Sequence, residues 1–271
     1  PTRELALQID ESVRSYGTHT GLRSTTIYGG VGKGKQKSAL QRGVDIVVAT
    51  PGRLLDLHGE GFIDLSWVDV LVLDEADRML DMGFVRDVRK IVAAVPDQRQ
   101  TLLFSATMPT EIQELARTVL YKPELIEVGQ RRDPAATVAQ QAVRVAEKDK
   151  QHLLQHLLEN EPIDKAIVFT RTKYRADRVK KKLDQAGFSA IAIHSNRTQG
   201  QRQRALKGFE EGQYRVLVAT DIAARGIDID GVSHVVNFDA PNVPEDYIHR
   251  IGRTGRAEST GDAITFISAA E

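Results

Sequence analysis

The sequence contains no cysteine. Disulfide bonds, thiolate nucleophiles and cysteine-based zinc sites are therefore excluded. Long apolar runs are lacking as well: stretches such as 91–95 hold only a few residues, whereas a membrane-spanning helix needs roughly 20. We therefore expect no membrane partner. The absence of cysteine suits a reducing compartment, and we expect a cytoplasmic protein.

An excess of charge of either sign is also lacking. The 37 Lys and Arg residues balance the 37 Asp and Glu residues. Overall charge therefore neither favours nor excludes a nucleic-acid partner. The composition is otherwise that of a folded globular chain, with 41% hydrophobic and 27% charged residues.

Short β-branched runs alternate with longer helical patterns along the chain, which predicts parallel βαβ units. A length of 271 residues suits two lobes better than one core. The expected strands are 25–28, 45–50, 68–73, 101–104 and 125–128, then 166–170, 190–194, 215–220, 234–238 and 263–267. We predict an α/β chain with lobes at 1–130 and 141–271, joined by an aperiodic linker at 131–140 that contains a proline.

Three carboxylates follow the apolar strand predicted at 68–73, in the order Asp74, Glu75, Asp77. Open α/β sheets bind ligands at this end of their strands. Asp74 suits Mg²⁺, which needs only one or two protein carboxylates beside nucleotide phosphates, and Glu75 could polarise a water that attacks a γ-phosphate. Asp77 could hold a partner segment. The plainer alternative is an acidic helix N-terminus, which the helix dipole favours in any case.

The segment Gly29 to Lys35 has the G-x-x-x-x-G-K spacing of a phosphate-binding loop. Gln36 stands where such a loop needs a Ser or Thr hydroxyl for Mg²⁺. We therefore interpret the segment as a glycine-rich turn with mobile lysines near a polyanion.

Arg250, Arg253 and Arg256 are spaced three residues apart, which on a helix would place them on one face. Three desolvated guanidinium groups repel one another unless an anion lies between them, and a phosphate chain is the obvious anion. The alternative is a solvated basic helix face, although the glycines at 252 and 255 disfavour a simple helix. Because His249 has no second His or Cys at metal-site spacing, we assign no transition metal.

Taken together, these segments resemble the DEAD-box helicases of superfamily 2 over essentially the whole chain. The first half carries PTRELA at 1–6, GG at 29–30, TPGR at 50–53, DEAD at 74–77 and SAT at 105–107. The second half carries IVFT at 167–170, Gln201 with Arg204, ATDIAARGID at 219–228 and HRIGRTGR at 249–256. All of them come in the family's order, which makes the resemblance specific.

The resemblance implies two tandem RecA-like lobes, with ATP in the cleft between them and RNA across both. It gives Asp74 to Mg²⁺, Glu75 to the attacking water, and Arg253 and Arg256 to the γ-phosphate, with Arg256 as the arginine finger. It also implies nucleotide contacts at Gly226 and Asp228. The residues expected to couple hydrolysis to lobe closure are Asp77, Ser105, Thr107, Asp221 and Arg250.

The resemblance further implies a single-stranded RNA or short RNA duplex as the partner. The residues expected to contact it, mostly through phosphates, are Thr2, Arg3, Gly29, Gly30, Thr50, Arg53, Gly200, Arg204 and Thr220. Such contacts carry little sequence information. Aromatic residues amount to only 6%, which leaves few rings for stacking bases and agrees with sequence-tolerant binding.

The chain departs from the family pattern at its start, because Pro1 lies inside the first RNA motif. We expect the adenine-reading segment and the true phosphate loop upstream, so that the parent protein is an ATP-hydrolysing RNA helicase and these 271 residues alone are inactive. The first lobe should then be N-terminally truncated and destabilised, while the second should fold alone. Two alternatives stay open: a non-catalytic RNA-binding clamp, and a DNA helicase of the same superfamily.

Overall fold

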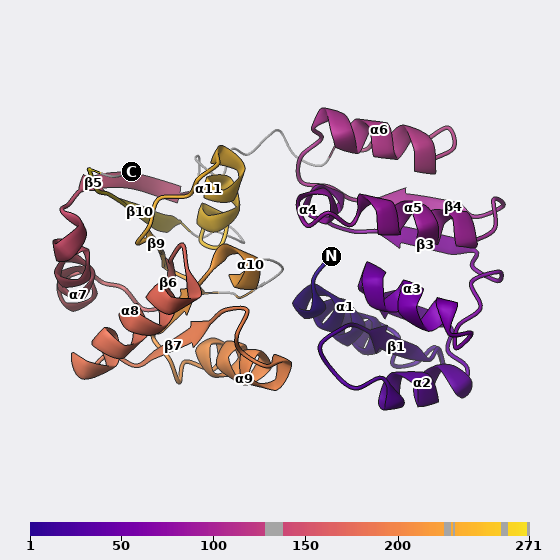
Figure 1. Cartoon of the computed structure of the whole chain (residues 1–271), viewed down its shortest axis with the longest axis horizontal. Coiled ribbons are helices and arrows are strands. Elements are labelled where there is room, and N and C mark those ends of the chain that lie inside the picture. Colours follow the sequence, from indigo (N-terminus) through magenta and orange to yellow (C-terminus); the bar gives the residue numbers. More distant parts are fainter. Residues whose placement is uncertain (128–137, 225–228, 230, 256–259, 270–271) are drawn as a thin grey trace. The chain divides into compact units, whose positions relative to one another are not determined.

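The computed structural model describes residues 1–127, 138–224, 229, 231–255 and 260–269, and the chain divides into two compact units (Figure 1). Unit 1 is Pro1–Ile126 and unit 2 is Glu127–Glu271. Most of the predicted linker lies outside the described residues. Its last residues do not belong to a linker, because 138–140 begin a strand of the unit 2 sheet.

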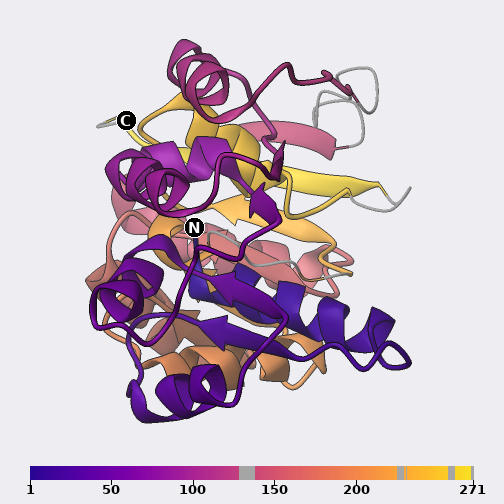
Figure 2. The same ribbon diagram turned by 90° about the vertical axis from the view of Figure 1, so that its right-hand side faces the viewer.

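Unit 1 contains two separate pairs of parallel strands with helices packed against them (Figures 1 and 2). Its elements are α1 (Arg3–Tyr16), β1 (Ser24–Ile27), α2 (Gly34–Gln41), β2 (Ile46–Ala49), α3 (Pro51–Gly59), β3 (Val70–Leu73), α4 (Ala76–Asp81), α5 (Val85–Ala94), β4 (Gln100–Leu103) and α6 (Thr110–Val119). Strand β1 pairs with β2, and β3 pairs with β4. Within the described residues, no ladder joins the two pairs.

The core beside β3 explains why the carboxylate segment is held firmly. Leu73 at the end of β3 packs with Met79 of α4, Val88 of α5 and Ile112 of α6, all nearly fully buried. Apolar residues at helical spacing turn one face of α5 and α6 toward this cluster. The chain that follows Leu73 is thereby anchored on both sides.

Unit 2 is built on one parallel six-stranded sheet in the order β5-β10-β9-β6-β8-β7. Its elements are β5 (Val138–Arg144), the 3₁₀ helix η2 (Glu147–Asp149), α7 (Lys150–Asn160), β6 (Ala166–Phe169), α8 (Lys173–Gln185), β7 (Ala190–Ile193), α9 (Gln199–Glu210), β8 (Val216–Ala219), α10 (Asp221–Ala224), β9 (His234–Asn237), α11 (Pro244–Ile251) and β10 (Gly261–Ile267). The central strands β6, β8 and β9 are buried throughout. Such continuous apolar runs are typical of parallel sheets covered on both faces.

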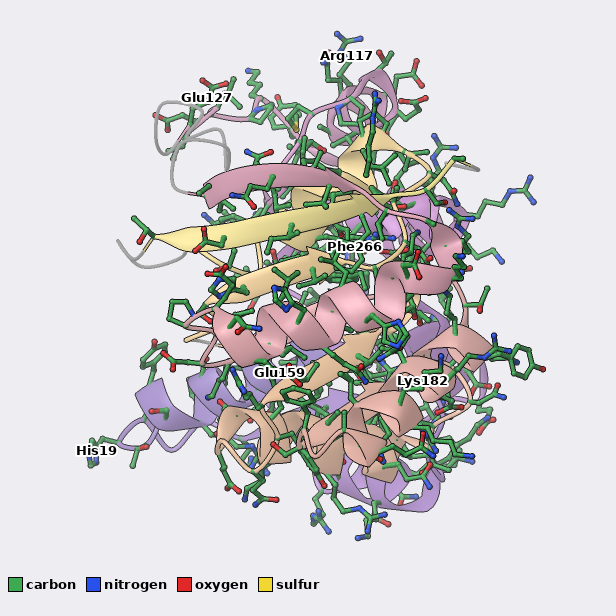
Figure 3. All side chains as sticks on the ribbon, turned by 90° about the vertical axis from the view of Figure 1, so that its left-hand side faces the viewer. His19, Arg117, Glu127, Glu159, Lys182 and Phe266 are labelled. Atoms are coloured by element: carbon green, nitrogen blue, oxygen red, sulfur yellow. The ribbon has the colours of Figure 1, made fainter. Side chains whose placement is uncertain are left out.

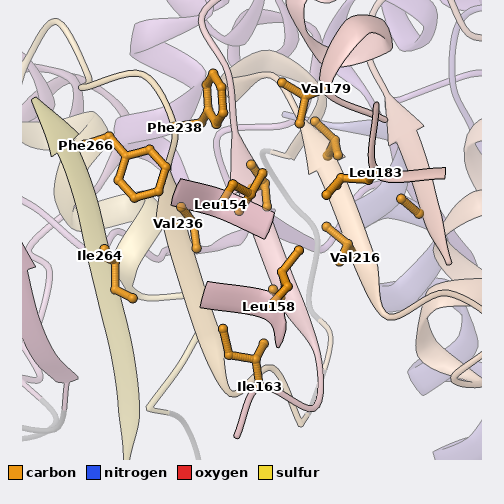
Figure 4. Close-up of a cluster of buried hydrophobic side chains, with 14 of the residues drawn as sticks. Leu154, Leu158, Ile163, Val179, Leu183, Val216, Val236, Phe238, Ile264 and Phe266 are labelled. Carbon is orange, nitrogen blue, oxygen red and sulfur yellow. The ribbon is translucent and has the colours of Figure 1, made fainter. Parts of the chain in front are cut away.

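Two apolar clusters cover the two faces of this sheet. On one face Leu154 of α7, Leu183 of α8, Phe238 and Phe266 belong to one apolar cluster (Figure 4). Phe266 is fully buried, whereas Glu159 and Lys182 lie at the surface (Figure 3). On the other face Phe209 of α9 packs with residues of β6, β7 and β8. Unit 2 therefore has a complete two-sided core.

The predicted strands are found within two residues of their expected limits, with one exception. The strand predicted at 125–128 is wrong over the described residues 125–127, because Leu125 and Ile126 are about three-quarters exposed and pair with no described strand. Strand β5 was not predicted. No helix in the described part of the chain has the length and apolarity that a bilayer crossing requires.

Candidate functional site

The carboxylate segment lies where β3 and β4 end side by side. Phe104 N donates to Leu73 O at 2.8 Å, and Ala76 N donates to Phe104 O at 3.0 Å, which continues the contact between the segments beyond the ladder. Glu75 lies between β3 and α4 in the left-handed region, with φ 50°. A non-glycine residue there is uncommon, and such strain clusters at functional sites.

Asp77 joins this segment to the residues after β4. Its Oδ2 accepts hydrogen bonds from Thr107 N and Thr107 Oγ1, both at 2.9 Å, and its own N–H donates to Ser105 Oγ at 3.1 Å. Ser105 Oγ donates to Thr107 O at 2.7 Å. Asp77 is only 6% exposed. The structure thus brings together the three residues predicted to couple hydrolysis in the first lobe.

Asp74 is half-buried, and its Oδ1 accepts a hydrogen bond from Glu75 N at 2.9 Å. Burial raises the pKa of the Asp74 carboxyl above its usual range, and the nearby carboxylates of Glu75 and Asp77 add to the rise, against the hydrogen bond from Glu75 N. A nearby cation would reverse this shift. A carboxylate oxygen such as that of Asp74 is the kind of ligand that Mg²⁺ prefers.

The glycine-rich segment does not form a phosphate-binding loop. Helix α2 begins at Gly34, and the ammonium of Lys33 contacts Asp56 at 2.8 Å and Glu60 at 2.6 Å. Lys37 contacts Glu60 at 2.6 Å. These two lysines lower the pKa of the Glu60 carboxyl to about 2. The expectation of mobile lysines is therefore wrong for Lys33, because acidic groups of α3 and its C-terminal end bind it.

In unit 2, Arg250 and Asp221 form a two-pronged ion pair. Arg250 Nε lies 2.6 Å from Asp221 Oδ1, and Nη2 lies 2.8 Å from Oδ2. The remaining prong, Nη1, donates to Asn237 Oδ1 at 3.1 Å and to Asp239 O at 2.7 Å. The guanidinium group is 3% exposed. The last two predicted coupling residues are therefore also in contact.

Arg250 and Arg253 of the basic motif do not share one helix face. Helix α11 ends at Ile251, and Gly252 caps it, so that Arg253 lies beyond the helix with Nε donating to His249 O at 3.3 Å. Arg256, Gly226 and Asp228 lie outside the described residues.

Comparison with known proteins matches residues 1–115 to the DEAD/DEAH box helicase family and residues 149–258 to the helicase conserved C-terminal domain. The solved structure of S. cerevisiae Dbp5 bound to RNA and ADP BeF3 is 32% identical, has a TM-score of 0.85, and is matched over 99% of this chain and 70% of that chain. The chain belongs to the DEAD-box helicase family. Its two units are the tandem RecA-like domains of that family.

Two curated relatives are similar to this DEAD-box chain along its length. The ATP-dependent RNA helicase CshA of Listeria monocytogenes is 46% identical over 271 residues, covering 100% of this chain and 52% of that protein. The ATP-dependent RNA helicase DBP2 of Debaryomyces hansenii is 47% identical over 272 residues, covering 99% of this chain and 51% of that protein. The chain therefore spans about half the length of the curated relatives it matches.

The residues predicted to contact RNA in unit 1 gather where β1 and β2 end. Thr2 caps α1, its side chain accepting from Leu5 N at 3.3 Å. Gly30, which follows Gly29, has φ 78° and lies beside the guanidinium of Arg3. A β-carbon added at Gly30 would lie 2.3 Å from Arg3 Nη1. Thr50 N donates to Ile27 O, at the entry to α3. Any other residue at position 30 would have a strained backbone and would displace the Arg3 side chain.

The side chain of Arg53 is largely occupied by the protein itself. Its Nη1 and Nη2 donate to Val31 O at 3.3 and 3.2 Å, and its side chain is 11% exposed. The arrangement indicates that Arg53 fixes the loop after Gly30.

The RNA candidates of unit 2 lie on α9 and after β8. Gly200 is in the first turn of α9, where Thr198 and Gln201 form a capping box. Arg204 is exposed, and its Nε donates to Gly200 O at 3.3 Å. Thr220 follows β8, and its N–H donates to Ile193 O at 3.4 Å. The RNA role of these residues stays a prediction.

Sequence reasoning missed one residue of the DEAD segment, Arg78. Its Nη1 donates to Glu75 Oε1 at 2.9 Å, and its side chain is 5% exposed. The signal was present in the sequence, because residues three apart at a helix start face one another.

Proposed function

We propose that this chain forms the two RecA-like lobes of an ATP-dependent RNA helicase of the DEAD-box family. The observation that carries the proposal is the strand-end carboxylate segment joined through buried Asp77 to Ser105 and Thr107. The relatives support it, because CshA and DBP2 are named ATP-dependent RNA helicases and the Dbp5 structure holds RNA and ADP BeF3. The proposed protein acts in the cytoplasm.

Asp74 would hold Mg²⁺. A half-buried carboxylate whose pKa is raised by burial gains most from a nearby divalent cation, and a single protein carboxylate beside nucleotide phosphates suffices for this metal. When bound, Mg²⁺ neutralises charge that develops on phosphate oxygens during transfer.

Glu75 would handle the attacking water. The water oxygen bonds to the γ-phosphorus of ATP while the bond from that phosphorus to the bridging oxygen breaks, and its electron pair leaves on ADP. Glu75 accepts the proton that the water loses and returns it to solvent. Arg253 and Arg256 would stabilise the charge of the transferring phosphoryl group, and Gly226 and Asp228 would contact the nucleotide.

Hydrolysis would be coupled to RNA through the two buried networks. Asp77 ties the carboxylate segment to Ser105 and Thr107, while Asp221 and Arg250 tie the strand end of β8 to α11. Each network links a strand end to a second segment of its own unit. A change at a bound nucleotide therefore reaches residues that make no contact with it.

Single-stranded RNA or a short RNA duplex would bind through its phosphates. In unit 1 the contact groups are Thr2, Arg3, Gly29, Gly30 and Thr50, with Arg53 supporting their loop; in unit 2 they are Gly200, Arg204 and Thr220. Backbone groups, short side chains and arginines read phosphates without reading bases. We expect little sequence preference and a strong dependence on salt.

RNA-stimulated ATP hydrolysis tests the proposal, measured for this chain beside a version extended upstream to include a phosphate-binding loop. We expect hydrolysis in the extended version, and its loss in Glu75→Gln by roughly 10²- to 10⁴-fold with ATP and RNA binding retained. RNA binding without hydrolysis in the extended version would instead support a non-catalytic clamp. Stimulation by DNA alone would support a DNA helicase.

A further inference from the structure

The Glu75 carboxylate is held from one side by a buried arginine. Arg78 is the third residue of α4, and its Nη1 donates to Glu75 Oε1 at 2.9 Å. Its side chain is 5% exposed, while that of Glu75 is 28% exposed. The arginine is therefore an interior contact of the carboxylate.

The contact makes the two oxygens of Glu75 unequal. Oε1 accepts from Arg78, whereas the buried Oε2 has no hydrogen-bond partner in the described part of the chain. Glu75 itself has a left-handed backbone conformation, with φ 50°, directly before α4. One oxygen is fixed and the other is available as an acceptor.

A contribution to stability is a weak explanation for the burial of the Arg78 side chain. Its neighbours in α4, Ala76 and Met79, are buried and belong to the apolar cluster of unit 1. Placing a guanidinium beside them carries a desolvation cost that one ion pair at three-residue spacing often fails to offset. An exposed arginine on the neighbouring helix α5, Arg89, has no such contact with the carboxylate segment. The burial of Arg78 instead fits a role in geometry.

We propose that Arg78 is a positioning residue for hydrolysis: it binds Oε1 of Glu75 and thereby presents Oε2 to the attacking water. The inference rests on the proposed function, in which Glu75 handles that water. In this proposal Arg78 acts only through Glu75 and takes part in no chemical step. Its effect is orientation, which is worth much in rate because a misplacement of about 1 Å can cost 10²-fold.

The test is steady-state ATP hydrolysis, with saturating RNA, by the upstream-extended protein carrying Arg78→Met, Arg78→Lys, Arg89→Met or Glu75→Gln. Arg78→Met should lower kcat roughly 10- to 100-fold, with the KM for ATP and the Kd for RNA unchanged within about twofold. Arg78→Lys should recover part of the loss, because its ammonium can still donate to Oε1. Arg89→Met is the matched surface control and should behave as wild type.

A double variant separates positioning from simple damage to the fold. Arg78→Met added to Glu75→Gln should cause no further loss of kcat, since the carboxylate to be positioned is already gone. A further loss equal to that in the wild-type background would overturn the inference, as would full kcat in Arg78→Met. If Glu75→Gln itself retained wild-type turnover, the proposed role of Glu75 and the inference would both fall. Loss in Glu75→Gln with none in Arg78→Met removes the inference alone.

Discussion

Strands β3 and β8 have nearly the same sequence, VLVL and VLVA, yet they are buried to very different degrees. In β8 all four side chains are fully buried, whereas in β3 Val70 is 52% and Val72 is 50% exposed. The difference comes from the neighbours. Strand β8 lies between β6 and β7, while β3 pairs with β4 alone among the described strands. An apolar strand thus reaches its full stabilising effect only when strands on both sides and helices on both faces cover it.

The largest expected effect of this difference is on independent folding. Expressed alone, residues 127–271 should unfold in one cooperative transition, because their sheet is continuous and covered on both faces. Residues 1–126 alone should bind an apolar dye and show no sharp transition, because their strand pairs are separate and part of β3 is exposed. Circular dichroism during heating measures both. A sharp transition in the first piece at the temperature of the second would contradict the comparison.

The second effect concerns two ion pairs of equal length in different surroundings. Arg250 and Asp221 in unit 2, and Arg14 and Asp10 in unit 1, each have an Nε to carboxylate distance of 2.6 Å, but the arginine side chains are 3% and 60% exposed. Arg250→Met should cost roughly 3–5 kcal/mol of unfolding free energy, because Asp221 loses its counter-charge in a largely buried place. Arg14→Met should cost less, roughly 1–3 kcal/mol, because the Arg14 side chain is solvated, although Asp10 is only 11% exposed and is left without this partner.

Hydrogen exchange followed by mass spectrometry measures each cost in the peptides of its own unit. Equal loss of protection around the two sites would show that burial does not determine how much each ion pair contributes to the unfolding free energy. Arg250→Lys is the useful intermediate, since it keeps the charge and loses the fork that binds both oxygens of Asp221.

The elements that sequence reasoning predicted well are those whose local pattern agrees with their surroundings. Strands β6, β8 and β9 are uninterrupted apolar runs and were placed within a residue of their limits. Strand β5 was missed because its sequence, VAQQAVR, has mostly exposed polar positions and owes its place to pairing with β10. The apolar residues at 125–126 gave the opposite error. Their local pattern predicts a strand, but no described strand pairs with them. Pairing partners are not encoded in a local pattern.

The candidate site divides in the same way. Motif order was enough to predict that Asp77, Ser105 and Thr107 act together, and hydrogen bonds join them. The lysine loop was misread, because the acidic partners of Lys33 lie 23 and 27 residues along the chain. Arg78 was missed although its partner is three residues away, because no rule of spacing distinguishes a buried pair from an exposed one.

Two valines at matching positions of β8 and β3 test how strongly burial affects the cost of a substitution. Val218→Ala in β8 should cost roughly 2–3 kcal/mol, because a fully buried side chain leaves a cavity. Val72→Ala at the matching position of β3 should cost under about 1 kcal/mol, since half of that side chain already meets water. Protection of each strand against hydrogen exchange gives both values. Costs within about 0.5 kcal/mol of each other would mean that β3 is covered as well as β8.

The smallest expected effect is on the stability of unit 2, which should depend on pH because His234 is buried. His234, at the start of β9, is 8% exposed; its Nδ1 lies 2.9 Å from Ser233 Oγ and its Nε2 lies 3.6 Å from Asp262 Oδ2. Burial lowers the pKa of His234, against the attraction of Asp262. The unfolded chain therefore binds a proton more readily, and stability is lost as pH falls through the unfolded pKa of about 6.5.

Urea unfolding of residues 127–271 at pH 7.5 and at pH 5.5 measures this loss, which His234→Gln should reduce. Asp262→Asn should enlarge it, because the neighbouring carboxylate partly offsets the lowering of the histidine pKa. The two substitutions thus change the difference in stability between pH 7.5 and pH 5.5 in opposite directions. A general weakening of the sheet would instead lower stability equally at both pH values. An unchanged difference in both variants would place the pH dependence of unit 2 elsewhere in its charged groups.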